Sequence, residues 1–234
     1  MELSQRIQAV QVKISKAAQE AGRDPGEITL CAATKTQTDD TIRRAISAGI
    51  TVCGENRVQE LTAHLQADAY ADARAVHFIG HLQTNKVKQV VGKVALIQSV
   101  DSPRLLQAID TCAAQLNLVQ DILLEVNIAQ EAQKGGCLPA ELPALAALAA
   151  SLSHVRLQGL MAIPPISSAP GSNRPHFLAM HQLFVDITGK ISDNKGEVPW
   201  LSMGMSDDFE DAIACGATLV RVGSALFGPR IATP

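Results

Sequence analysis

The chain has 234 residues, of which 47% are hydrophobic and 3% aromatic, and its formal net charge is −3 at pH 7. This length suffices for one large α/β barrel or for two small domains. Neither the slightly acidic balance nor any run of like charges suggests a nucleic-acid-binding surface, and no apolar segment is long enough to cross a bilayer. The five cysteines form no CxxC pair, and the segment MELSQRIQAV does not resemble a signal peptide. We therefore expect buried thiols in a reducing, cytoplasmic setting, with no disulfide and no metal site.

Apolar runs of strand length alternate with helix-like segments along the whole chain. A first helix is expected over residues 3–21, where Ile7, Val10 and Ile14 recur at helical spacing and Gly22 follows. Strands are expected over residues 28–35, 50–54, 76–80, 94–100, 118–128, 155–163, 198–204 and 218–223. Helices are expected between them, over residues 38–49, 55–67, 86–91, 102–116, 139–152, 176–191 and 206–216.

Strict alternation of strands and helices predicts a parallel sheet. Eight such units in a chain of this length predict an α/β fold, a single (β/α)8 TIM barrel with an extra N-terminal helix. An open doubly wound sheet is the alternative, but no G-x-G-x-x-G follows an early strand. No linker or change of composition divides the chain, so residues 1–234 are expected to form one domain.

The stretch ITLCAATK at residues 28–35 ends a small-residue strand with a lysine. Period-2 alternation places Cys31, Ala33 and Lys35 on one face, which we expect to line the crowded barrel interior. Lys35 would then project from the carboxyl end of the strand, where barrels place their chemistry. A lysine in a partly apolar pocket loses proton affinity and can attack an aldehyde. A surface lysine at a strand end is the alternative interpretation.

The loops after the seventh and eighth expected strands have the composition of a phosphate site. The first is SMGMS, which contains Ser206 at an expected helix start, and the second begins with Gly223 and Ser224. Barrels often bind phosphate with these two loops, because glycines let backbone N–H groups approach an anion and serine hydroxyls add donors. The alternative is that Ser206 is an ordinary helix N-cap and that the glycines are turn residues.

Arg221 shares a strand face with Leu219 and Gly223, and a guanidinium at the end of a buried strand needs an anion or a strong acceptor. A structural salt bridge would satisfy it equally well. Together, the lysine, the phosphate loops and the arginine suggest a phosphorylated aldehyde held as a Schiff base, namely pyridoxal 5′-phosphate (PLP). Because arginine only donates hydrogen bonds, it would keep the ring nitrogen of PLP unprotonated and make the ring a weaker electron sink.

Six segments carry a resemblance to a known family. They are AATKT around Lys35, GENRVQE, HFIGHLQTNK, GLMAIPP, LSMGMSDDFEDAI and VRVGSALFG. In this order and over nearly the whole chain, they resemble the pyridoxal phosphate homeostasis protein family, whose fold-type III barrels are similar to the barrel domain of alanine racemase. One departure is His81, where proline is common.

The resemblance implies that Lys35 carries PLP as a Schiff base and that Arg221 meets the pyridine nitrogen. It implies that the phosphate is held by Ser206, Gly223 and Ser224, that Asn56 lies beside the ring, and that Met161 and Ser202 line the pocket. It further implies a role in PLP homeostasis and in amino-acid and keto-acid balance without robust catalysis, with apo forms of PLP-dependent enzymes as candidate partners. We expect a monomer that binds neither nucleic acid nor membrane.

Two enzymatic alternatives remain. A PLP-dependent amino-acid racemase with weak activity would need a base on each side of the ring, and the sole tyrosine, Tyr70, lies in a helical segment where a structural role is expected. A barrel enzyme that forms a Schiff base with a sugar phosphate would need carboxylates at inner strand ends, and Glu125 is its best candidate. No acid and base pair stands out, which favours a binding protein.

Overall fold

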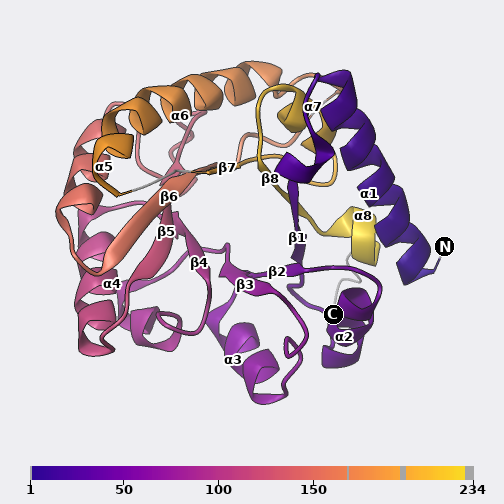
Figure 1. The fold of residues 1–234 in the computed structure, drawn as a ribbon, viewed down its shortest axis with the longest axis horizontal. Helices are drawn as coiled ribbons and strands as arrows, with labels where there is room; N and C mark the ends of the chain where they lie inside the picture. Colours follow the sequence, from indigo (N-terminus) through magenta and orange to yellow (C-terminus); the bar gives the residue numbers. More distant parts are fainter. Residues whose placement is uncertain (1, 168, 196–198, 230–234) are drawn as a thin grey trace.

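The computed structural model describes residues 2–167, 169–195 and 199–229. Eight parallel strands close into a barrel in sequence order, with β1 paired to β8 (Figure 1). The strands are β1 (Thr29–Ala33), β2 (Val52–Glu55), β3 (Ala75–Phe78), β4 (Leu96–Val100), β5 (Gln120–Val126), β6 (Val155–Ala162), β7 (Trp200–Ser202) and β8 (Leu219–Val222). The predicted (β/α)8 TIM barrel is therefore confirmed, together with its extra N-terminal helix.

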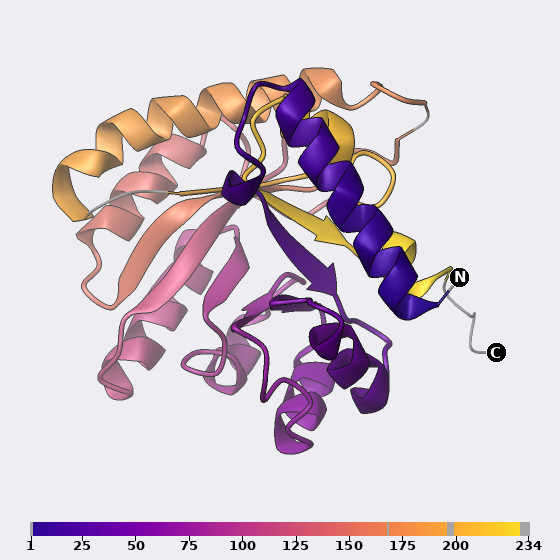
Figure 2. The ribbon, with the colours of Figure 1, turned by 45° about the vertical axis from the view of Figure 1, so that its right-hand side comes forward.

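The helices form a layer outside the strands, as Figures 1 and 2 show from two directions. They are α1 (Leu3–Glu20), α2 (Asp39–Ser47), α3 (Val58–Gln66), α4 (Pro103–Gln115), α5 (Leu142–Ser151), α6 (Arg174–Lys195), α7 (Phe209–Ala214) and α8 (Ser224–Phe227), with the 3-10 helices η1 (Pro25–Glu27) and η2 (Thr84–Gln89). Within the described ranges, the helices are too short or too polar to span a membrane.

The extra helix α1 packs outside the barrel, against α7 and α8. Its predicted stripe of Ile7, Val10 and Ile14 is buried in the outer core. Polar contacts reinforce this packing, because Lys13 pairs with Glu210 at 3.1 Å and Arg23 Nη1 donates to the carbonyl of Ala217 at 2.8 Å. Both views show α1 lying alongside α7 and α8.

The structure corrects several predicted boundaries. Residues 55–67 were expected to be helical throughout, but Glu55 is the last residue of β2, where it pairs in register with Phe78 of β3, and α3 begins only at Val58. The helix expected over residues 86–91 is the 3-10 helix η2, and η1 and α8 were not predicted. The expected seventh strand began at residue 198, which lies outside the described residues; β7 runs from Trp200.

Side chains alternate between the barrel interior and the outer layer, as the sequence pattern requires. Cys31 and Ala33 pack inside the barrel with Val52, Ile79 and Leu219, whereas Ala32 packs outward in the core beneath the helices. This confirms the predicted faces of the first strand. A second interior cluster joins Leu96, Leu123 and Met161.

Candidate functional site

Lys35 lies in a turn just beyond the carboxyl end of β1 and is half-buried. Ala33, two residues earlier, packs on the face of β1 that faces the barrel interior. The next residue, Thr36, has φ +65°, an uncommon conformation for a residue with a Cβ. Lys35 therefore lies at the carboxyl end of β1, in a turn that requires a positive φ at the next residue.

Arg221 is 4% exposed at the carboxyl end of β8. Its Nη1 donates to the hydroxyl of Ser202 at 2.5 Å, and its Nη2 donates to the carbonyl of Ala162 at 2.9 Å. Among the residues that the structure describes, no carboxylate forms an ion pair with Arg221, so the structural salt bridge considered from the sequence is not seen. Burial lowers the pKa of this guanidinium. A buried cation held by neutral acceptors retains donors for an anion or a ring nitrogen.

Ser202 links Arg221 to two polar residues that the sequence analysis did not single out. Its hydroxyl donates to Oε1 of Gln98 at 2.7 Å, and Nε2 of Gln98 lies 2.9 Å from Nδ1 of His77. The side chains of Ser202, Gln98 and His77 are all buried. The sequence did contain a signal for Gln98, because it is a polar residue at an inward position of the otherwise largely apolar strand over residues 94–100.

The directions of these hydrogen bonds follow from chemistry. Arginine can only donate, so the Ser202 oxygen accepts from it and the Ser202 proton goes to Gln98 Oε1. Gln98 then offers its amide N–H to His77 Nδ1, which must be unprotonated. Burial, with a smaller contribution from the nearby Arg74, lowers the pKa of His77 to about 4, in agreement with a neutral ring.

Met161 lies in the same layer of the barrel as Ser202, with which it is in register across β6 and β7. It is completely buried and packs against Leu96 and Leu123. The structure therefore places Met161 in the packed interior and leaves it no exposed surface at the barrel edge.

Ser206 brings together the loops after β7 and β8. Its hydroxyl accepts hydrogen bonds from the backbone N–H groups of Gly223 and Ala225, both at 3.2 Å. Ser206 was expected at the start of the helix over residues 206–216, with an ordinary N-cap as the alternative to a phosphate ligand. This helix, α7, begins only at Phe209 after Asp208, so Ser206 is not its N-cap. Ser206 instead binds the start of α8, whose first residue is the exposed Ser224.

Gly223 lies next to the strand that leads to Lys35. A Cβ at Gly223 would stand 3.5 Å from that of Ala33, which is an ordinary contact distance. In β8 and β1, Arg221 pairs in register with Cys31. The arginine, the phosphate-type loop and the lysine turn are thus neighbours at the carboxyl edge of the barrel.

Asn56 follows the last residue of β2 and is half-buried. Its Oδ1 is buried and has no hydrogen-bond partner among the described residues. Its main chain is pressed against Gly80, where a Cβ would lie 2.1 Å from the Asn56 carbonyl oxygen. Buried acceptors in native proteins are normally satisfied, so this atom is suited to a ligand or an ordered water.

Glu125 points into the barrel from β5 and is 8% exposed. Burial and the nearby Asp101 raise its pKa, Arg221 lowers it, and the net result is a pKa of about 7. The two carboxylates approach the same point, since a Cβ at Gly135 would lie 3.8 Å from Glu125 Oε1 and 3.9 Å from Asp101 Oδ2. The inward carboxylate that the sugar-phosphate alternative required is therefore present.

The residues at this edge fit PLP. The group needs a lysine for its aldehyde, donors for its phosphate and a polar partner for its ring nitrogen. At the edge that bears Lys35, the amide oxygen of Asn56 has no hydrogen-bond partner among the described residues, and Arg221 forms no ion pair with a carboxylate there. Both groups can therefore form hydrogen bonds with a ligand. The five cysteines are free and buried, and no cluster of three or more metal-ligating side chains occurs in the described part of the chain.

Comparison with known proteins points to one family. Residues 6–231 match the family described as alanine racemase, N-terminal domain. The chain is 42% identical over 230 residues to the pyridoxal phosphate homeostasis protein of Aquifex aeolicus, covering 98% of this chain and 99% of the relative. It is 38% identical over 228 residues to the protein of the same name from Pseudomonas aeruginosa, covering 97% and 96%.

The fold agrees with a solved relative. PipY of Synechococcus elongatus without PLP superposes with a TM-score of 0.84 at 31% identity, covering 97% of this chain and 100% of PipY. The same protein with PLP bound superposes with a TM-score of 0.80 at 30% identity, with the same coverage. The chain thus belongs to the pyridoxal phosphate homeostasis protein family, built on the alanine racemase N-terminal domain fold.

Proposed function

We propose that this protein binds PLP at the carboxyl edge of its barrel and carries it as a Schiff base on Lys35. The observation that carries the proposal is the convergence of three features at this edge. Arg221 is buried and forms no ion pair with a carboxylate of the described residues. Its strand, β8, pairs in register with β1, the strand that leads to Lys35. Next to them, the hydroxyl of Ser206 accepts a hydrogen bond from the N–H of Gly223. A relative of 30% identity, PipY, is named with PLP bound, which supports PLP as the ligand.

Each residue has a distinct part in this proposal. Arg221 donates to the ring nitrogen, and the phosphate lies against Ser206, Gly223 and Ser224. Asn56, with its unpartnered Oδ1, lies beside the ring. Met161 and Ser202 support the pocket from beneath, because they are completely buried in adjacent strands.

The role that fits these residues is that of a carrier in PLP homeostasis and in amino-acid and keto-acid balance, without robust turnover. Bound PLP supplies an electron sink, and an arginine that only donates keeps the ring nitrogen unprotonated and weakens that sink. Tyr70 supports this interpretation, since its hydroxyl donates to Glu55 at 2.7 Å in the outer layer and does not face the barrel interior. A weak racemase activity is the alternative function.

The setting of the protein forms part of the proposal. Five free, buried thiols suit the reducing conditions of the cytoplasm. We place residues 1–234 in a single domain that acts as a monomer, because the closed barrel leaves no strand edge for pairing between copies. Apo forms of PLP-dependent enzymes are the proposed recipients of the cofactor.

The test is a visible absorption spectrum of the purified protein with PLP, before and after borohydride reduction. We expect a Schiff-base band that reduction converts into a covalent adduct mapped to Lys35. Lys35→Ala should lose the adduct, whereas Lys13→Ala, which alters a surface ion pair on α1, should keep it. A wild-type protein that stays colourless with added PLP would exclude the proposal. Assays of alanine racemization on the same samples separate carrier from racemase.

A further inference from the structure

The turn that carries Lys35 is short and conformationally demanding. It runs from Thr34 to Thr38, between the end of β1 and the start of α2. The N–H of Gln37 donates to the carbonyl of Thr34 at 3.0 Å, and Thr36 has φ +65°. A threonine in this region costs free energy that the surroundings must offset. The contacts that hold the turn therefore decide where the lysine amine stands.

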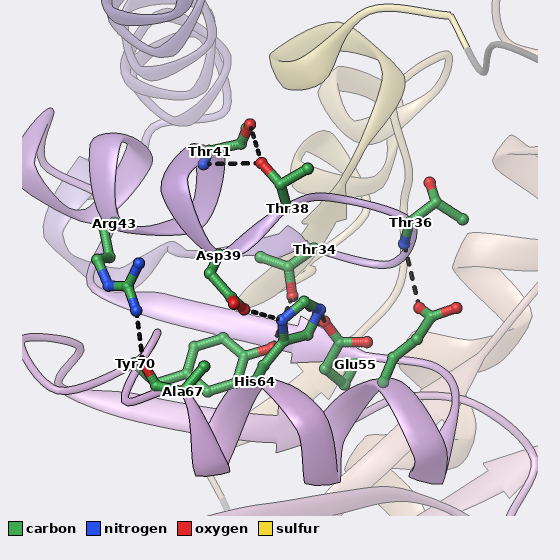
Figure 3. Close-up of polar contacts among 11 residues, drawn as sticks. Thr34, Thr36, Thr38, Asp39, Thr41, Arg43, Glu55, His64, Ala67 and Tyr70 are labelled. Carbon is green, nitrogen blue, oxygen red and sulfur yellow. Dashed lines mark hydrogen bonds and ion pairs between the residues drawn. The ribbon is translucent and has the colours of Figure 1, made fainter.

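The first contact comes from α3. Oε2 of Glu60 accepts the backbone N–H of Thr36, the residue with the positive φ, at 3.1 Å (Figure 3). Oε1 of the same carboxylate pairs with Arg57 Nη1 at 3.2 Å. Glu60 lies in the first turn of α3 and its side chain is 23% exposed. It therefore holds the residue next to Lys35 from a helix that belongs to the neighbouring strand–helix unit.

The second contact lies beneath the turn and is completely buried. The Thr34 hydroxyl donates to Glu55 Oε1 at 2.6 Å, and Tyr70 donates to the same oxygen at 2.7 Å (Figure 3). Thr34 and Glu55 are both 0% exposed. Each directly precedes a proposed cofactor residue, because Thr34 is followed by Lys35 and Glu55 by Asn56.

The third contact fixes the far end of the turn. Asp39, in the first turn of α2, lies 2.5 Å from Nδ1 of His64 on α3, and the ring of His64 meets Tyr70 edge-on. Figure 3 shows Asp39, His64, Tyr70, Glu55 and Thr34 converging from separate elements beneath the turn. The lysine turn is thus held at its beginning, middle and end by side chains of β2, α3 and the loop after α3.

We propose that Glu60 and Glu55 are positioning residues, which hold the Lys35 turn in the conformation that PLP requires. The inference rests on the proposed function of Lys35 and assigns a role to two further residues of the segment GENRVQE. Glu60 acts through the Thr36 N–H, and Glu55 acts through the Thr34 hydroxyl. Neither residue needs to touch the cofactor.

Two pairs of substitutions test these hydrogen bonds. In each pair, one variant removes the hydrogen bond and the other replaces the residue but keeps the bond. Glu60→Ala removes the acceptor of the Thr36 N–H, whereas Glu60→Gln keeps an amide oxygen there. Thr34→Val removes the hydroxyl that donates to Glu55 with little change of shape, whereas Thr34→Ser keeps it. Asp24→Ala is the matched control, because Asp24 accepts the Gly26 N–H at 2.9 Å in η1, before β1 and hence at the opposite end of the barrel.

The measurements are the affinity for PLP, from the visible spectrum, and the rate at which borohydride traps the Lys35 adduct. Hydrogen exchange of the Thr36 amide reports on the turn without PLP. We expect Glu60→Ala and Thr34→Val to weaken PLP binding about tenfold, which corresponds to the loss of one good hydrogen bond. Exchange at Thr36 should be faster in Glu60→Ala, and both conservative variants should restore the wild-type values.

The outcomes distinguish the inference from the function on which it rests. Wild-type affinity and trapping rate in both Glu60→Ala and Thr34→Val would overturn the positioning role while the Lys35 adduct stands. An equal loss of affinity in Asp24→Ala would also overturn it, because the effect would then be one of general stability. A wild-type protein that forms no adduct would remove the function and the positioning role together.

Discussion

Nη1 of Arg221 lies 2.5 Å from Oγ of Ser202, and this contact sets the direction of the hydrogen bonds that continue to Gln98 and His77. The guanidinium, the hydroxyl, the amide and the imidazole come from β8, β7, β4 and β3, so the chain of bonds crosses the barrel. Each member is buried and is hydrogen-bonded to its neighbour in the series. The removal of one member therefore leaves a buried group without that partner.

Ser202→Ala should reduce the free energy of unfolding by about 2 kcal/mol, because it leaves both Arg221 and Gln98 short of a buried partner. Urea unfolding followed by circular dichroism measures the change. Ser151→Ala is the control, since Ser151 donates to Leu148 on the exposed side of α5. Its free energy of unfolding should stay within about 0.5 kcal/mol of the wild type. Equal effects of the two substitutions would show that the buried network adds no stability.

Ser206→Ala should weaken the binding of PLP more than the binding of pyridoxal, which lacks the phosphate. Ser206 accepts the N–H groups of Gly223 and Ala225, so its loss disorders the loop that the phosphate would meet. We expect the Kd for PLP to rise about tenfold, the size of one lost hydrogen bond, and the Kd for pyridoxal to change little. Titrations of both compounds by absorption provide the comparison. A proportional loss for both would place the phosphate elsewhere.

His77 should make the protein less stable as the pH falls from 6.5 towards 4. Burial lowers its pKa from 6.5 in the ordinary state to about 4 in the folded protein. Between these values the unfolded chain binds more protons, so the free energy of unfolding decreases with falling pH. Relative to His77→Gln, which does not titrate, the wild type should lose about 3 kcal/mol over this range. Stability curves of the two proteins that run parallel between these pH values would contradict a neutral, buried His77.

Glu125 should act in the opposite direction. Burial and Asp101 raise its pKa from 4.5 to about 7, so the folded protein binds more protons between these values. The free energy of unfolding should therefore fall as the pH rises from 4.5 to 7, by about 3 kcal/mol relative to Glu125→Gln. Because His77 and Glu125 oppose each other, the wild type should show a flatter pH dependence than either variant. A wild type and a Glu125→Gln variant with the same pH dependence would contradict the raised pKa.

Much of the fold, and several candidate site residues, could be predicted from the sequence. The barrel followed from eight alternating units, and the inward face of Cys31 and Ala33 followed from period-2 alternation, which sterics impose on every strand. Lys35, Ser206, Arg221 and Gly223 stood out because they follow or end strands, and parallel strands bring their carboxyl ends to one edge. Their roles toward PLP remain predictions.

Two local interpretations were wrong for a shared reason. Glu55 suits a helix start by its sequence, but pairing with β3 holds it in β2. Ser206 suits a helix N-cap, but its hydroxyl turns to the N–H groups of Gly223 and Ala225 from another segment. In both cases a partner distant in the chain outweighed the local preference, and local sequence contains no information about such a partner.

The sequence by itself therefore determined the architecture and the edge of the barrel where we propose the site, since both depend on periodicities along the chain. Only the tertiary structure decided how the site is held. The acceptors of Arg221, the link from Ser202 to Gln98 and the contact of Glu60 with Thr36 each join different strand–helix units. Hydrogen bonds of this kind depend on distance and direction in space, which are fixed only when the barrel closes.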